Sequence, residues 1–145
     1  AAYQTGLPYH AFVLLGDGEC QGGIVWEGAM TAAKYHLGNL IAILDSNRVQ
    51  LDGMVADIMP VEPMADKWRA CGWQVLEADG HSVTELATAL DQALATGDRP
   101  TIIIAHTTKG KGVSFMENKS FWHGNVPSDE QLVQALAELG EVKHG

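Results

Sequence analysis

A glycine-flanked aspartate and a distant asparagine have the types and the spacing to hold a metal ion beside an anion. Asp17 lies between Gly16 and Gly18, and Asn47 follows further along the chain. A carboxylate and an amide oxygen are hard ligands that suit Mg²⁺ or Ca²⁺, and glycines let the backbone approach a ligand closely. An aspartate alone would repel a phosphate. The pattern therefore predicts a diphosphate site bridged by Mg²⁺ or Ca²⁺.

Two apolar runs, at 11–15 and 40–44, must position these residues. Each run is typical of a buried parallel strand, and one helix-length segment separates them. A right-handed crossover sets both strand ends at the same edge of the sheet, where Asp17 and Asn47 can face one ligand. The simpler alternative is an ordinary turn at Asp17, with Asn47 as a cap or turn residue. Two oxygen ligands at strand ends, separated by one crossover, favour the binding site.

Strands and helices alternate along the whole sequence. This order predicts an α/β fold with a doubly wound parallel sheet and helices on both faces, in a single domain of residues 1–145. Because the chain begins without Met and enters a strand almost at once, we expect residues upstream of Ala1. The other expected elements are a mostly buried helix at 24–36, a short extension at 49–53, irregular chain at 54–60, a helix at 61–71 with Trp68 on its buried side, a strand at 73–78, a helix from a capping box at Ser82–Glu85 to Gly97, a strand at 101–105, and a helix from a second capping box at Ser128–Gln131 to Gly140.

The composition limits the partners of the protein. The chain has 145 residues, with 9 Lys and Arg against 18 Asp and Glu, so neither a nucleic acid nor an anionic membrane is an expected partner. No stretch approaches the roughly 18 apolar residues of a membrane span. Cys20 and Cys71 have no metal-ligand spacing and suit a reducing compartment. We expect a cytoplasmic protein that uses a cation to bind a phosphorylated ligand.

The motif also resembles that of a known family. Gly16-Asp17-Gly18 followed by Asn47 is similar to the thiamine diphosphate motif, which begins Gly-Asp-Gly and ends in Asn. Three stretches resemble the diphosphate-binding domain of transketolases, above all the amino-terminal subunit of bacterial split transketolases. They are GDGECQGGIVWEGAMTAAKYHLGNLIAILDSNRVQLDG, TTKGKGVSFMENKSFWHGNVP and PSDEQLVQALAEL. The resemblance covers nearly the whole chain and implies the thiamine diphosphate-binding fold.

Matching positions imply roles for individual residues. Asp17 and Asn47 would bind the metal together with the backbone carbonyl of Val49, while Gly16 and Gly18 would lie against the diphosphate. The expected cofactors are therefore thiamine diphosphate and Mg²⁺ or Ca²⁺.

Basic residues near strand ends are weaker candidates. His123 matches a catalytic histidine that sits over the cofactor, although its surroundings alone indicate a packed or surface residue. Lys109 and Lys111 flank glycines at a strand end, where most lysines are merely solvated, and Lys109 is the cofactor-binding candidate of the two. His106 is expected to be a packing residue at a strand end rather than a catalyst.

Glu27 shares one stripe of its predicted helix with Thr31 and Lys34, which by itself indicates a solvated face. In transketolases the matching glutamate belongs to a buried carboxylate network that joins two active sites across the dimer, so the resemblance implies a catalytic role for Glu27. This chain has Gly22 where the family has another glutamate, which removes one carboxylate from the network.

The resemblance implies a transketolase, which moves a two-carbon ketol unit between sugar phosphates with thiamine diphosphate and Mg²⁺. It also implies a partner, the carboxy-terminal subunit with the pyrimidine-binding domain, in a dimer of heterodimers. Three alternatives remain open: another thiamine diphosphate enzyme, such as a 2-oxo acid dehydrogenase component or deoxyxylulose phosphate synthase; a non-catalytic cofactor-binding subunit; and a generic phosphate-binding α/β module.

Overall fold

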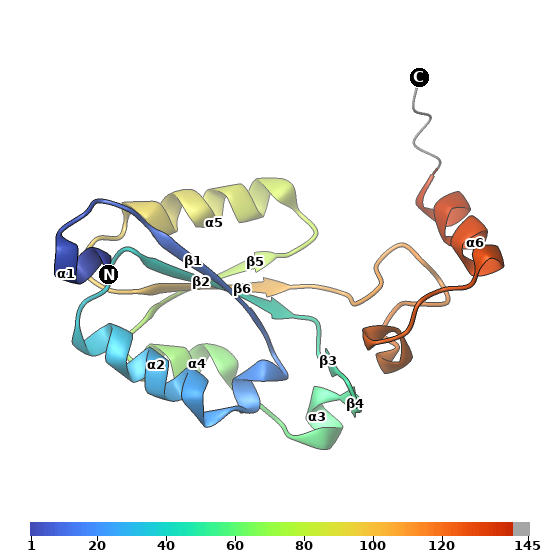
Figure 1. Cartoon of the computed structure of the whole chain (residues 1–145), viewed down its shortest axis with the longest axis horizontal. Coiled ribbons are helices and arrows are strands. Elements are labelled where there is room, and N and C mark those ends of the chain that lie inside the picture. The colour runs from blue at the N-terminus through green and yellow to red at the C-terminus, as the bar shows by residue number, and fades with distance from the viewer. Residues whose placement is uncertain (141–145) are drawn as a thin grey trace.

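The computed structural model of the chain describes residues 1–140. Its centre is a parallel sheet of strands β1 (Ala11–Gly16), β2 (Leu40–Ser46), β5 (Gln74–Asp79) and β6 (Thr101–His106), in the order β1-β2-β6-β5 (Figure 1). Because all four strands run in parallel, their carboxyl ends meet at one edge. A small antiparallel ribbon of β3 (Val49–Gln50) and β4 (Gly53–Met54) continues from the end of β2.

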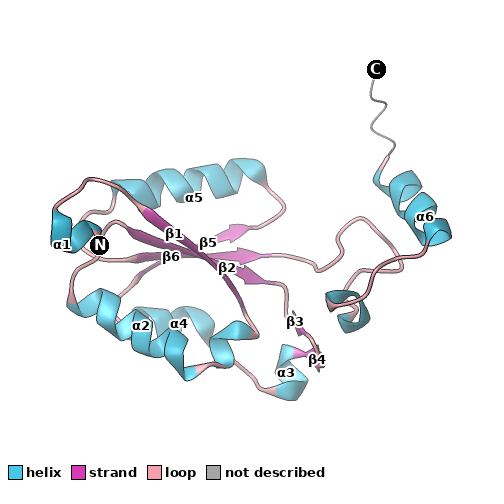
Figure 2. Cartoon of the chain, viewed as in Figure 1, coloured by secondary structure: helices cyan, strands magenta, loops and turns pink. Residues whose placement is uncertain are grey.

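Helices cover both faces of this sheet. Helices α2 (Gly23–Lys34) and α4 (Met64–Ala70) lie on one face and α5 (Val83–Ala95) lies on the other, as Figures 1 and 2 show. The predicted α/β class, with helices on both faces of a parallel sheet, is therefore confirmed. The remaining elements are α1 (Ala2–Thr5), η1 (Glu19–Gln21), α3 (Val55–Ile58), η2 (Ser120–His123) and α6 (Asp129–Leu139), the last beyond the carboxyl edge of the sheet.

A cluster of three tryptophans fills the core beneath α2 and α4. Trp68 is 2% exposed, which confirms its predicted burial, and its ring centroid lies 5.1 Å from that of Trp26 and 4.8 Å from that of Trp73. The indole N–H of Trp73 donates to the carbonyl of Ala29 at 2.9 Å. The indole N–H of Trp68 has no partner among the described residues. This cluster fixes α4 against α2 and the sheet.

Strand β1 is not buried as its apolar sequence predicted. The run at 11–15 does form a strand, but Phe12 is 55% and Leu14 72% exposed. β1 is an edge strand, and α5 contacts β5 and β6 rather than β1. An apolar run is buried on both faces only where helices cover both faces, and in the described chain one face of β1 lacks a helix.

The helix predicted at 24–36 also forms, as α2, but it is not mostly buried. Ala29 and Ala32 are buried, whereas Ile24 is 80% and Met30 58% exposed. Only one side of α2 lies on the sheet, so apolar residues on its other sides remain open to solvent.

Three local predictions need correction. Residues 54–60 are not wholly irregular, because Val55–Ile58 form α3. The helix predicted at 61–71 begins only at Met64, after Pro63, whose ring disfavours a helical conformation for the residue before it. The short helix α1 was not predicted. No helix of residues 1–140 is long and apolar enough to cross a membrane.

The two predicted capping boxes have different outcomes. At α6, the Ser128 hydroxyl accepts from the N–H of Gln131 and the Gln131 side chain accepts from the N–H of Ser128, so this box is complete. The helix ends before Gly140, as predicted. At α5, the Ser82 hydroxyl accepts from the Glu85 N–H at 3.3 Å, but the Glu85 carboxylate accepts from the N–H of Asp79 instead. The box at α5 is thus half formed, because Asp79 at the end of β5 competes for Glu85.

The tryptophan cluster yields a stability test. Trp73→Phe and Trp68→Phe remove the same atoms from the core, but only Trp73→Phe also breaks a hydrogen bond. We expect Trp73→Phe to lower the free energy of unfolding by about 1 kcal/mol more than Trp68→Phe, measured by urea unfolding of the full-length protein. Equal losses would show that the bond from Trp73 to Ala29 adds no stability.

Candidate functional site

A cavity of about 610 Å³ lies at the carboxyl edge of the sheet. Its walls come from the loop after β1, the end of β2, the β3–β4 ribbon and the chain that follows β6. All of the residues predicted from the sequence to bind cofactor or metal line it: Gly16, Asp17, Gly18, Asn47, Val49, Lys109 and His123. Residues far apart in the sequence therefore meet in one site.

A second cavity of about 590 Å³ lies near the amino ends of β1 and β2. Its lining includes Tyr9, Tyr35 and Leu37 and contains no acidic or basic side chain. Of these two cavities, the one at the carboxyl edge has the charged groups that can bind a metal or an anion.

Asp17 is the most buried charged group of the carboxyl-edge cavity, at 4% exposure. One carboxylate oxygen accepts from the N–H of Gly18 at 2.7 Å and the other accepts from the N–H of Arg48. Burial raises the pKa of Asp17, and the nearby Asp45 raises it further, although the bonds from Arg48 and Gly18 act in the opposite direction. Since no cationic side chain of residues 1–140 pairs with Asp17, a bound cation would relieve this buried charge.

Asn47 is held with its amide in a defined orientation. Its Nδ2 donates to Asp45 at 2.8 Å, and its Oδ1 accepts from the N–H of Val49 at 2.9 Å. A carbonyl oxygen has two lone pairs, so Oδ1 retains one for a metal ion. Arg48, between Asn47 and Val49, adopts a left-handed conformation with φ 65°, and this turn carries its N–H to Asp17.

The donor set fits a hard divalent cation. Among residues 1–140, no group of 3 or more His, Cys, Asp or Glu side chains could hold a metal ion. The oxygen donors of this cavity that could hold a metal ion include the Asp17 carboxylate, the amide oxygen of Asn47 and a backbone carbonyl such as that of Val49. Oxygen ligands of this kind suit Mg²⁺ or Ca²⁺.

Gly18 is required by close packing. A Cβ at this position would lie 2.9 Å from the Cβ of Gln50, so only glycine lets the loop after β1 approach the β3–β4 ribbon. Gly16 has open space where a Cβ would lie, and its N–H donates to the Glu19 carboxylate at 3.1 Å. The two glycines of the motif thus have different local roles.

His123 reaches the cavity from η2, far from Asp17 in the sequence. The neighbouring Trp122 fixes this turn, because its indole N–H donates to the carbonyl of Phe115 at 2.9 Å. The rings of Phe115 and Phe121 pack on Trp122 at 5.3 Å and 5.0 Å. His123 itself is exposed, so its imidazole is accessible to a ligand.

The cavity wall is strongly acidic. Beside Asp17 it contains Glu19, Asp45 and Asp52, and Lys109 is its one lysine. The sequence pattern did not single out Asp45 or Asp52 as site residues. Sequence position could have identified Asp45, because it lies two residues before Asn47 at the end of the same strand. Such a wall would repel a bare diphosphate, which again points to a bridging cation.

Four residues considered from the sequence lie outside this cavity: Gly22, Glu27, His106 and Lys111. Glu27 is exposed on α2, and its carboxylate has no hydrogen bond or ion pair within residues 1–140. Gly22 connects η1 to α2 with φ −76° and ψ 130°, a conformation open to any residue.

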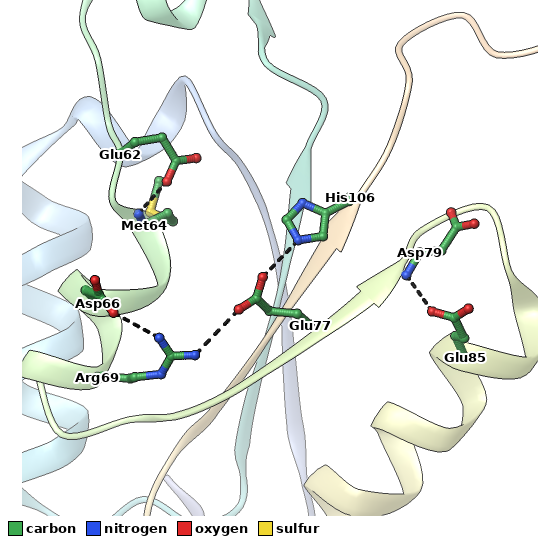
Figure 3. A network of polar contacts seen from close by, with 8 residues as sticks. All are labelled: Glu62, Met64, Asp66, Arg69, Glu77, Asp79, Glu85 and His106. Carbon is green, nitrogen blue, oxygen red and sulfur yellow. Dashed lines mark hydrogen bonds and ion pairs between the residues drawn. The ribbon is translucent and has the colours of Figure 1, made fainter.

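His106 is not the packing residue that the sequence predicted. Its side chain is 47% exposed, and its Nε2 lies 3.0 Å from the Glu77 carboxylate. Figure 3 shows Glu77 between His106 and Arg69, with Arg69 also paired to Asp66. These contacts form an exposed polar network that joins α4 to β5 and to the end of β6.

Fold and site together define a class of protein: an α/β protein with a cavity lined by carboxylate and amide side chains at the carboxyl ends of parallel strands. The family described as "Transketolase, thiamine diphosphate binding domain" matches residues 5–143. The chain belongs to this family, which confirms the resemblance stated from the motif.

Known relatives agree with this assignment. The chain is 42% identical over 141 residues to one subunit of an apulose-4-phosphate transketolase from Phocaeicola vulgatus, covering 97% of this chain and 50% of the relative. It is 43% identical over 133 residues to a 6-deoxy-6-sulfo-D-fructose transketolase subunit from a Clostridium species, covering 92% of this chain and 48% of the relative. It thus spans about half the length of these relatives.

A solved structure shares the fold. The transketolase of Campylobacter jejuni superposes with a TM-score of 0.85 at 32% identity, over 91% of this chain and 21% of that one.

The raised pKa of Asp17 predicts a pH effect on stability. The usual value is 3.8, and burial raises it in the folded protein, so the metal-free folded state keeps this proton to higher pH than the unfolded chain. The stability that protonated Asp17 contributes is gained as the pH falls through the raised pKa and is lost as the pH rises. We expect wild type to gain stability relative to Asp17→Asn between about pH 7 and about pH 4, measured by urea unfolding in a chelator. A constant difference across this range would contradict the expectation.

Proposed function

We propose that this chain is the diphosphate-binding part of a split transketolase, which moves a two-carbon ketol unit between sugar phosphates. In this proposal residues 1–145 form a single domain that binds thiamine diphosphate and Mg²⁺, or Ca²⁺. The observation that carries the proposal is the single cavity of a transketolase-family chain in which Asp17, Asn47, Val49 and His123 meet.

Asp17, Asn47 and the carbonyl of Val49 would hold the metal ion. The support is chemical: Asp17 is 4% exposed, lacks an ion-pair partner in residues 1–140, and has one free lone pair on each oxygen after the bonds from Gly18 and Arg48. A divalent cation would stabilise its charge and offer the remaining coordination positions to phosphate oxygens and water.

The loop after β1 would hold the diphosphate. Gly16 and Gly18 keep bulky side chains away from the cavity, and Lys109, which lines the same cavity, offers a cationic group to an anion. The metal offsets the acidic residues around it, so one cation and one lysine can bind a diphosphate despite the chain's net charge of −9.

Bound thiamine diphosphate would supply a carbon nucleophile and an electron sink for breaking a bond next to a ketose carbonyl. His123, which lines the same cavity, would hold or move a proton at a substrate oxygen through its imidazole. Its placement by the packed Trp122 is the support for this role. Glu27 would act at a distance, in contacts between active sites rather than in the cavity.

The partner in this proposal is a carboxy-terminal subunit with a pyrimidine-binding domain. The support is that two relatives of similar coverage are named as transketolase subunits. We further propose a cytoplasmic dimer of heterodimers that acts on sugar phosphates.

A non-catalytic cofactor-binding subunit is the second candidate. The specific observation in its favour is that Glu27 is exposed without a partner in the described chain, and the resemblance implies that Gly22 stands where the family has another glutamate. The two candidates share the cofactor site and differ in turnover.

The binding test uses the full-length subunit mixed with its partner. We expect thiamine diphosphate with Mg²⁺ to raise the melting temperature by several degrees, since ligand at about 100 times its Kd adds about 2.7 kcal/mol. Asp17→Ala should abolish the shift. Asp79→Ala, at the end of β5 and outside the cavity, is the matched control and should keep it. No shift in the wild-type pair would contradict the cofactor proposal.

An activity assay on the same pair separates the candidates. Transfer of a two-carbon unit from a ketose phosphate to an aldose phosphate supports the transketolase. Cofactor binding without any transfer favours the non-catalytic subunit, and release of carbon dioxide from a 2-oxo acid favours a 2-oxo acid dehydrogenase or synthase activity.

Gly22 offers a further prediction. The φ and ψ of Gly22 suit any residue, and an added Cβ would lie 3.3 Å from the Glu19 carbonyl oxygen, a close contact that needs only a small local shift, so Gly22→Glu should fold and keep cofactor binding. If the missing carboxylate limits catalysis, Gly22→Glu should raise kcat, whereas Gly22→Ala, which adds a side chain without charge, should not. Equal kcat values for the three proteins would show that position 22 does not limit turnover.

A further inference from the structure

We propose that Asp45 is a positioning residue that holds the Asn47 amide with its oxygen toward the metal cavity, and that Thr107 clamps Asp45 in place. This inference rests on the proposed function, because it assigns a role toward the same metal ion. The observation behind it is a chain of side-chain bonds that joins two neighbouring strand ends.

Each oxygen of Asp45 has its own donor. One accepts from Nδ2 of Asn47 at 2.8 Å, and the other accepts from the hydroxyl of Thr107. Asp45 lines the cavity, but its two oxygens are already engaged by these side chains. Its carboxylate is therefore bonded directly to the amide of Asn47 and is in a position to orient it.

These bonds determine which end of the Asn47 amide faces which neighbour. A carboxylate only accepts, so the NH₂ group must point to Asp45, and the N–H of Val49 only donates, so Oδ1 must point to Val49. A flipped amide would set oxygen against carboxylate and NH₂ against N–H. Without Asp45, Val49 alone would orient the group, and NH₂ could occupy the position where a metal needs an oxygen.

Thr107 is itself fixed by two contacts, and the second of them is to Gly80, which is held in turn by His106. It follows β6, and its N–H donates to the carbonyl of Ser46 at 3.3 Å. Its methyl group packs against Gly80, where an added Cβ would lie 2.3 Å from Cγ2 of Thr107. The N–H of Gly80 donates to the carbonyl of His106 at 2.8 Å. The ends of β2, β5 and β6 thus hold the hydroxyl that orients Asp45.

A purely electrostatic role for Asp45 is the competing explanation, because any carboxylate near the cavity would attract a cation. The two explanations differ at Thr107. Thr107→Val removes the hydroxyl and leaves the charge of Asp45 in place, so it weakens metal binding only if orientation matters. Thr107→Ser restores the hydroxyl and should restore binding.

The experiment measures Mg²⁺ affinity by calorimetry in the full-length subunit with its partner and saturating thiamine diphosphate. We expect Asp45→Asn and Thr107→Val each to weaken Mg²⁺ binding by about 10-fold or more, the usual effect of losing a residue that orients a metal ligand. Thr107→Ser should bind like wild type. So should Glu77→Gln, which removes a carboxylate on β5 outside the cavity.

The outcomes separate this inference from the function on which it rests. If the wild-type pair binds no Mg²⁺, both fall. If wild type binds and Thr107→Val binds equally well, the positioning role is wrong and the proposed function stands. If Thr107→Ser is as weak as Thr107→Val, the defect is not the missing hydroxyl and the inference is again overturned. Should Asp45→Asn not fold, the Val and Ser variants of Thr107 decide the question between them.

Discussion

The site is arranged around one buried carboxylate at the edge of a parallel sheet. Taking Asp17 out of water destabilises its charge, and the protein compensates only in part, with N–H bonds from Gly18 and Arg48. The neighbouring acidic residues increase the cost. A bound divalent cation would remove this penalty, so the same burial that weakens the metal-free protein would favour metal binding.

The order of the strands decides which groups can share that cation. β6 lies beside β2 in the sheet although three helices and three strands separate them in the chain. This placement brings Thr107 next to Asp45, and it directs the following segment, with Lys109 and His123, back over the cavity. Strand order thus connects the predicted metal ligands to the groups that would contact the diphosphate and the substrate.

The backbone at Gly22, where the resemblance implies a glutamate in the family, does not require glycine. Its extended conformation is accessible to every residue, although an added Cβ would lie 3.3 Å from the Glu19 carbonyl oxygen and would need a small local shift. Glu27, on the same helix, projects from the described chain without a partner. Gly22 and Glu27 both lie outside the cavity, so a difference at either position leaves the lining of the cavity complete.

Much of the fold and of the site could be predicted because the signals are local. Apolar runs placed four strands, the complete capping box at Ser128 placed α6, and the motif from Gly16 to Asn47 named residues that do line one cavity. These features depend on neighbours in the sequence, through backbone geometry and side-chain reach.

The burial of side chains and the bonds between distant segments could not be predicted from local sequence signals. The exposure of Phe12 and Leu14 follows from the edge position of β1, and Glu85 bonds to Asp79 because the end of β5 lies nearby. The bonds from Asn47 to Asp45 and on to Thr107 likewise exist only once β2 and β6 are adjacent. The sequence by itself determined the elements and the chemical groups, and the tertiary structure decided which of them touch, because contact between distant segments depends on how the whole sheet is ordered.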